Sequence, residues 1–367
     1  MSIKYKNNGA WVKSPNTINV IQKTDIPEEA FTATGNCKYK FSYGGWDWFI
    51  RDYGNRITTN NITDGTNMFY YSNVEEIPFE LNFDSSANIY LNFMFNSCVN
   101  LTSIPKFNNC KVRDLNNMFN SCTKLRYLPE DIADWFDWSF IESQTTAYGA
   151  GSMNSILPQC CSLRSVPMDF LAHANPALVN SYTYLYNGFT GCYTLDELVG
   201  LPLPYTATYT SNLFSSTFTS CFRLKNVTFA LDPDTNAPYV KNWKNQTIDL
   251  SKNVGYGTAY DIKSITDFNS GITADKQVRD DATYQALKND PDWFANNVEY
   301  SRYNHDSAVA TINSLPDTSA YLASAGGTNT IKFKGDSGSA TDGGAINTLT
   351  TEEIAVATAK GWTVTFV

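Results

Sequence analysis

The chain has 367 residues, of which 42% are hydrophobic, 14% are aromatic and only 17% are charged. This composition can fill a large core and excludes wholesale disorder. The formal net charge of −9 argues against a nucleic-acid-binding protein, which normally presents a basic face. No apolar run is long enough to cross a bilayer, so we expect no membrane insertion.

The first 20 residues predict an attachment segment separate from the body of the protein. They begin MSIKYKNNGAWVKSPNT and contain no apolar stretch of the kind found in secretory signal peptides. We therefore expect a protein that is made and kept in a cytosol, or that leaves it by lysis or an unusual route. Because the cytosol keeps thiols reduced, the eight cysteines are not expected to form disulfides.

Residues 21–60 are expected to form an N-terminal β cap. The stretch CKYKFSYGGWDWFIRDYG, residues 37–54, alternates apolar and polar residues on either side of Gly44 and Gly45. Alternation around a glycine pair is typical of a β-hairpin. Stacked repeats need such a cap at each end.

Residues 61–270 contain six related stretches, and in four of them a Phe is followed three residues later by Cys and three further on by Leu. One of the other two has Ser72 in place of the Cys, and the other has Leu157 in place of the Phe. Spacing by threes places these side chains on one face of each repeat. Repeats of this length bury their apolar faces by stacking, so we predict a buried structural ladder. Its members are Phe95, Cys98, Leu101, Phe119, Cys122, Leu125, Cys160, Leu163, Phe189, Cys192, Leu195, Phe218, Cys221 and Leu224.

The ladder cysteines have a chemical and a structural interpretation. Successive ladder cysteines are 24 to 38 residues apart and form no C-x-x-C pair, which does not suit a zinc or redox site. Free cysteine packs as a small hydrophobic residue, so a structural role is favoured.

Insertions between the repeats are expected to lie on one face, where solenoids often bind partners. Several insertions carry aromatic rings, which suit sugar stacking and protein hot spots. The alternative is that the rings only cover the core. The candidate receptor contacts are Trp135, Phe136, Trp138, Tyr182, Tyr184, Tyr205 and Tyr209.

Residues 271–367 are expected to form a C-terminal α/β capping region. The segment HDSAVATINSLPD predicts a short helix, and NTIKFKG predicts a strand. A second helix should begin at an N-cap of Thr350 or Thr351 and end at Gly361. The final strand should cover residues 362–366.

No set of residues points to catalysis, a metal or a cofactor, so we expect no enzyme activity. The stretch KGDSGS resembles a serine-protease nucleophile segment, but neither His173 nor His305 lies in a matching context. The stretch DPDTN begins like a calcium loop and lacks the required Gly and Glu. Both stretches are better explained as turns.

The repeats resemble the BspA-type leucine-rich repeats. Residues 112–125 carry the family pattern V-x-x-M-x-x-M-F-x-x-C-x-x-L, with Leu115 at the first Met position. This resemblance implies a mixed α/β, strand-rich fold: a leucine-rich-repeat solenoid with an N-terminal β-hairpin cap and a C-terminal helix–strand cap.

The N-terminal stretch SIKYKNNGAWVKSP is similar to segments that open many phage fibre and appendage proteins. The resemblance implies a structural protein of a tailed bacteriophage particle, in a fibre or appendage. Ile3, Tyr5, Trp11 and Val12 would anchor it to other virion proteins, and the repeats would meet a host-surface glycan or protein. Such fibres are often trimers, although no heptad or collagen-like run supports a homo-oligomer here. The alternatives are a bacterial leucine-rich-repeat surface adhesin and a purely structural capsid or tail decoration protein.

Overall fold

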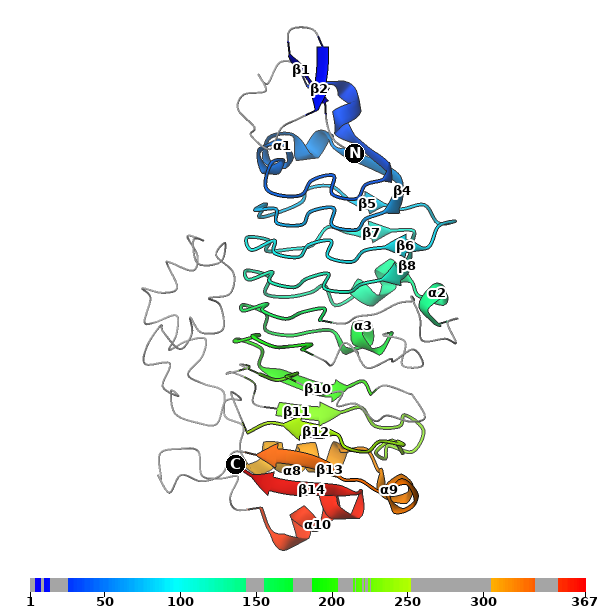
Figure 1. Ribbon diagram of the computed structural model, residues 1–367, viewed down its shortest axis with the longest axis vertical. Coiled ribbons are helices and arrows are strands. Elements are labelled where there is room, and N and C mark those ends of the chain that lie inside the picture. The colour runs from blue at the N-terminus through cyan, green and yellow to red at the C-terminus, as the bar shows by residue number, and fades with distance from the viewer. Residues whose placement is uncertain are drawn as a thin grey trace, which may run out of the picture.

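The computed structural model describes residues 4–7, 10–13, 26–142, 155–173, 187–203, 214, 216–219, 221, 224, 226–251, 305–333 and 349–367. The chain makes successive turns that stack into an elongated body, with α1 near one end and α10 at the other (Figure 1). We call each stacked turn a tier.

The N-terminal end begins with strands β1 (Lys4–Asn7) and β2 (Ala10–Lys13), which pair antiparallel as a hairpin. Tyr5 lies opposite Val12, and Lys6 lies opposite Trp11. Ile3 lies outside the described residues. Three of the four residues expected to anchor the protein therefore belong to one two-stranded ribbon.

The first tiers contain η1 (Glu28–Phe31), β3 (Thr32–Asn36), α1 (Asp47–Tyr53), η2 (Gly54–Arg56) and β4 (Thr58–Asp64). Strands β3 and β4 pair in parallel, with Thr32 opposite Thr58. Consecutive tiers thus run in the same direction.

The middle tiers contain β5 (Leu81–Asn82), β6 (Ile89–Tyr90), β7 (Phe107–Asn108), β8 (Cys110–Asp114), η3 (Ile132–Trp135), β9 (Phe136–Asp137), α2 (Ser139–Glu142), α3 (Met168–Ala172), β10 (Glu197–Leu201) and β11 (Asn226–Phe229). Strand β5 pairs with β7, β8 lies between β6 and β9, and β10 pairs with β11, all in parallel.

The expected strand-rich leucine-rich-repeat solenoid with a β-hairpin cap is wrong. The described strands are only two to seven residues long, and they lie in six separate sheets of two or three strands. Residues 37–54 form turns followed by helix α1, not a hairpin. The structure is a mixed fold with six described helices and small sheets that are parallel apart from the β1–β2 hairpin.

Left-handed backbone recurs along the stack. Six of the described tiers contain a turn run in which two residues four positions apart have positive φ. The pairs are Tyr39 and Tyr43, Asn67 and Tyr71, Phe93 and Ser97, Asn117 and Ser121, Ser155 and Gln159, and Asn187 and Gly191. Gly and Asn tolerate this conformation better than bulky residues do.

The turn runs are joined by backbone hydrogen bonds that point from one tier to the next. The N–H groups of Phe93, Phe95 and Ser97 donate to the carbonyl oxygens of Asn116, Met118 and Asn120, over 2.9, 3.0 and 2.8 Å. The same pattern joins the other tiers, for example from Tyr43 to Tyr70 over 2.7 Å. Buried backbone groups are therefore satisfied without a continuous sheet.

An aromatic column fills the centre of the first tiers. The rings of Phe41, Phe69, Phe95 and Phe119 are buried and follow one another at centroid distances of 5.4, 5.4 and 5.8 Å. Leu157 takes the corresponding place in the next tier, two residues after the left-handed Ser155. Each ring contacts its equivalent in the adjacent tier, so the column forms only when the tiers stack.

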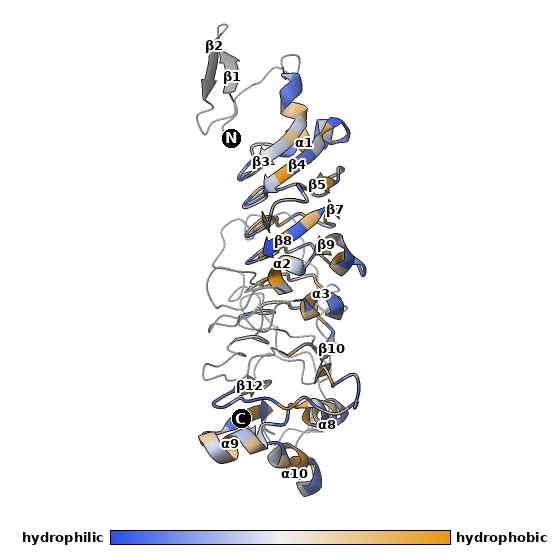
Figure 2. Ribbon diagram, turned by 90° about the vertical axis from the view of Figure 1, so that its right-hand side faces the viewer, coloured by the Kyte–Doolittle hydropathy of each residue, from blue (hydrophilic) through white to orange (hydrophobic). Residues whose placement is uncertain are grey.

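The C-terminal end closes the stack with a parallel sheet of β12 (Thr247–Asp249), β13 (Asn329–Phe333) and β14 (Trp362–Phe366). Around it lie α8 (His305–Ser314), α9 (Ser319–Ala325) and α10 (Thr351–Ala359). Thr350 is the N-cap of α10, as the sequence suggested. Helices α1, α3 and α10 carry both hydrophilic and hydrophobic residues (Figure 2), as expected of helices that cover a core with one face.

Candidate binding surface

All fourteen ladder residues are buried, with exposed fractions of 0–2%. Each ladder thiol also donates a hydrogen bond to a backbone carbonyl of the preceding tier. The Sγ atoms of Cys98, Cys122 and Cys160 lie 3.0, 3.1 and 3.0 Å from the carbonyl oxygens of Phe69, Phe95 and Phe119. Cys192 and Cys221 repeat the contact with Leu157 and Phe189 at 3.1 Å.

These contacts give the cysteines a structural task. Burial raises the pKa of the Cys122 thiol well above its usual value, which keeps the proton needed for donation. In the described residues, no group of three or more His, Cys, Asp or Glu side chains could hold a metal. The ladder cysteines therefore join neighbouring tiers by hydrogen bonds, and their protonated thiols are poor nucleophiles.

Ser72 occupies the cysteine position in the tier before Cys98, and it makes a different contact. Its hydroxyl donates to Oδ1 of Asp47 over 2.6 Å, and the N–H of Asn73 donates to Oδ2 of the same carboxylate over 3.0 Å. Asp47 is the first residue of α1, so this pair fixes the helix onto the stack.

The described aromatic insertion does not offer the expected surface. Phe136 and Trp138 are 7% and 6% exposed and pack against Phe170, so proposing them as receptor contacts was wrong. The physical reason is that the indole N–H of Trp138 bonds the Ala133 carbonyl over 2.8 Å and turns the ring inward. Trp135 is partly buried. Tyr182, Tyr184, Tyr205 and Tyr209 lie outside the described residues.

A different aromatic group is exposed in the first tiers. Tyr39, Tyr43, Tyr70 and Tyr71, here called the tyrosine cluster, come from two consecutive tiers. Tyr39 and Tyr43 are 44% and 66% exposed. The Tyr43 ring stacks on Tyr39 and on Tyr71 at centroid distances of 6.2 and 6.3 Å, and it meets Tyr70 edge-on at 5.5 Å.

The backbone of the cluster is strained. Tyr39, Tyr43 and Tyr71 have φ values of 60°, 61° and 57°, a conformation that bulky residues rarely adopt. Each such residue costs about 1–2 kcal/mol. The equivalent positions in later tiers hold small residues at Ser97, Ser121 and Gly191 and larger ones at Phe93 and Gln159. The tyrosines therefore stand at positions where a smaller residue such as glycine would fit the backbone better.

Tyr70 presents a neutral phenol group to the cluster. Burial, with a smaller contribution from the Tyr71 hydroxyl, raises the pKa of Tyr70 to about 12. One cation, the Lys38 ammonium, lies 5.6 Å from the centroid of the Tyr39 ring. The surface can therefore stack on flat partners and exchange hydrogen bonds without charge pairing.

Comparisons with known proteins add no family to this description. No family model, no curated protein and no solved structure matches the chain. None of the described helices is long and apolar enough to cross a membrane.

Proposed function

We propose that this chain is a structural protein of a tailed bacteriophage particle, a fibre or appendage component that is assembled in the host and carried on the virion. In this proposal the N-terminal hairpin attaches to other virion proteins. The tyrosine cluster contacts a glycan or protein of the host surface. The observation that carries the proposal is the exposed, strained tyrosine cluster.

Conformational cost supports a contact role for the cluster. Three of its residues hold positive φ, and two of its rings are exposed to solvent, so neither backbone preference nor core packing accounts for them. Strain of this kind persists where it serves function. Exposed tyrosines supply large contact areas at low entropic cost and dominate many interfaces.

The hairpin supports the attachment role. β1 and β2 place Tyr5 opposite Val12 and Lys6 opposite Trp11, so the segment similar to phage openings is a single structural unit. A short two-stranded ribbon is only marginally stable alone. Docking against another virion protein would supply the missing burial.

We expect the double change Tyr39→Asn and Tyr43→Ser to weaken adsorption to the host strain at least about tenfold, because two contact tyrosines are lost. Both new residues occur in left-handed positions of other tiers, at Asn117 and Ser121, so folding should be kept. Binding of purified protein to host cells and to a glycan array measures the effect. Tyr127→Ser is the matched control, because Tyr127 is 55% exposed and lies outside the cluster. Equal adsorption by the double variant and the wild type would refute the contact role.

Deletion of residues 1–20 should abolish incorporation into particles while leaving the purified protein folded. Quantitative proteomics of purified particles measures incorporation, and circular dichroism checks the fold. The tyrosine double variant serves as the control, since it should be incorporated normally. Wild-type levels of the deleted protein in particles would show that the hairpin is not the anchor.

A further inference from the structure

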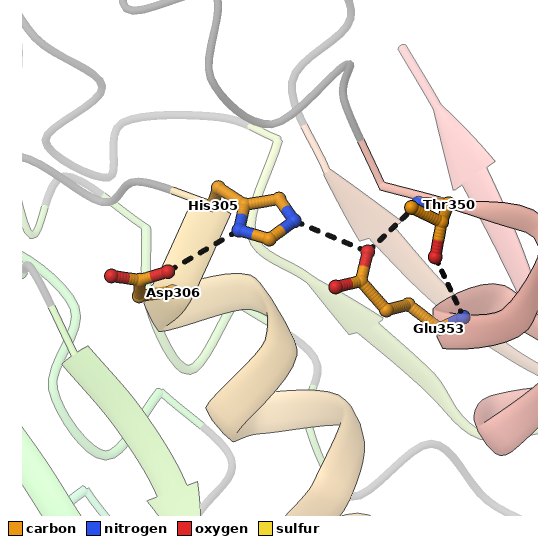
Figure 3. Close-up of polar contacts among 4 residues, drawn as sticks. All are labelled: His305, Asp306, Thr350 and Glu353. Carbon is orange, nitrogen blue, oxygen red and sulfur yellow. Dashed lines mark hydrogen bonds and ion pairs between the residues drawn. The ribbon is translucent and has the colours of Figure 1, made fainter.

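His305 lies between two carboxylates at the start of α8. Its Nδ1 atom is 3.3 Å from Oδ1 of Asp306, and its Nε2 atom is 3.1 Å from Oε2 of Glu353 in α10 (Figure 3). A neutral imidazole has one N–H donor and one lone pair, whereas the imidazolium ion donates from both nitrogens. Only the protonated ring satisfies both contacts.

Glu353 links this histidine to the start of α10. The same Oε2 atom accepts the Thr350 N–H over 2.8 Å, and the Thr350 hydroxyl accepts the Glu353 N–H over 3.2 Å. This is a complete capping box (Figure 3). One carboxylate oxygen therefore both caps α10 and holds α8.

The other end of α8 is held differently. The ammonium of Lys360, which follows α10, donates to the carbonyl oxygens of Ile312 and Asn313 over 3.0 and 2.6 Å. The hydroxyl of Ser314 accepts the N–H of Phe229 in β11 over 3.0 Å. The C-terminal end of α8 is thus joined to α10 and to the stack without any imidazole.

We propose that the His305–Glu353 contact is a pH-responsive latch, which holds the first turn of α8 to α10 most strongly while His305 is protonated and loosens on deprotonation. The Lys360 end of α8 stays attached and acts as the hinge. Loss of the proton removes the positive charge that pairs with Glu353, so at most a neutral hydrogen bond from the Nε2–H tautomer remains. In that tautomer Nδ1 faces Asp306 with no hydrogen between them.

The surrounding charges set the direction of the response. The hydrogen bonds that the imidazole donates to Asp306 and Glu353 raise the pKa of His305 above its ordinary 6.5. Those that Glu353 accepts from the Thr350 N–H and from His305 lower its pKa below its ordinary 4.5. Packed against α8, β11 supplies no titratable side chain, while α10 supplies Glu352 and Glu353, with Lys360 after them. Because the histidine pKa is raised, the stabilisation from this contact is fully present below pH 6.5. It is lost as the pH rises through the raised pKa. A lowered Glu353 pKa preserves the contact until the pH falls below about 4.5.

Titration of the histidine ring by NMR tests the latch. The chain has only two histidines, so His173→Gln leaves a single imidazole signal. We expect its pKa to lie above 6.5 and to fall in the Glu353→Gln variant. Glutamine also serves in capping boxes, so α10 is kept in that variant. An ordinary pKa that Glu353→Gln does not change would overturn the proposal.

Hydrogen exchange tests the release itself. As the pH rises through the histidine pKa, amide protection factors in the first turns of α8 and α10 should fall about two- to fivefold, as expected for loss of a partly exposed pair. His305→Gln should abolish this pH dependence. Arg56→Gln, which removes the exposed pair with Glu28 near the opposite end, should leave it unchanged. Protection that does not vary with pH in the wild type, after correction for intrinsic exchange, would also overturn the latch.

Discussion

Replacing Phe95 by alanine is expected to lower the free energy of unfolding by about 3–5 kcal/mol. The ring is fully buried between Phe69 and Phe119, with centroid distances of 5.4 and 5.8 Å. The Phe95 ring also meets the Phe107 ring of β7 edge-on at a centroid distance of 6.2 Å, so β7 loses a contact as well. The cavity would lie on the axis of the body, where neighbouring tiers cannot collapse without breaking the hydrogen bonds between them.

Urea unfolding of the two proteins measures the loss, and Phe95→Leu is the control. Leu157 occupies the equivalent position two residues after a left-handed serine, so a leucine is already accommodated by the tier geometry. We expect Phe95→Leu to cost roughly 1 kcal/mol, because volume-conserving changes are tolerated best. If leucine proved as harmful as alanine, ring stacking and not volume would hold the column together.

Replacing Cys122 by alanine should destabilise the protein by about 1–2 kcal/mol and leave host binding unchanged. The change removes a buried sulfur atom and the S–H donor that reaches the Phe95 carbonyl over 3.1 Å. That carbonyl also accepts the N–H of Cys98 over 2.9 Å, so one of its two bonds remains. The loss is therefore smaller than for a fully orphaned acceptor.

Cys161→Ala is the matched control for the ladder contact. Cys161 is also buried, but its thiol donates to Gln159 only two residues away, over 3.3 Å, and not to another tier. Urea unfolding should show a smaller loss for Cys161→Ala than for Cys122→Ala. Equal losses would mean that the cysteines contribute only through packing.

The spacing of Phe, Cys and Leu predicted which side chains lie in the core, because residues three apart share a face in helical or 3₁₀-like turns. The thiol hydrogen bonds could not be foreseen, since each depends on a carbonyl 27 or more residues away, as between Cys122 and Phe95. Residues 37–54 do not form the expected hairpin, because Tyr39, Tyr43 and Gly44 are left-handed and interrupt the extended backbone that an alternating pattern usually indicates.

The tyrosine cluster was missed for a related reason. Tyr43 and Tyr71 meet only because they lie in consecutive tiers, and neither residue belongs to an insertion. The sequence pattern that marks the cluster is the column of second left-handed residues in the turn runs. That column reads Tyr43, Tyr71, Ser97, Ser121 in successive tiers, and the aromatic members stand out against the small ones.

The described hydrogen bonds between turn runs all point the same way along the chain. Each run donates its N–H groups to the tier that follows it in the chain, as Phe95 donates to Met118 and Phe189 to Thr217. A growing chain therefore always ends in a run whose donors await a tier not yet made. The Ser314 hydroxyl of α8 accepts such a bond from Phe229 in β11. A chain cut short before α8 would leave that donor open, as a template for association with other unfinished chains.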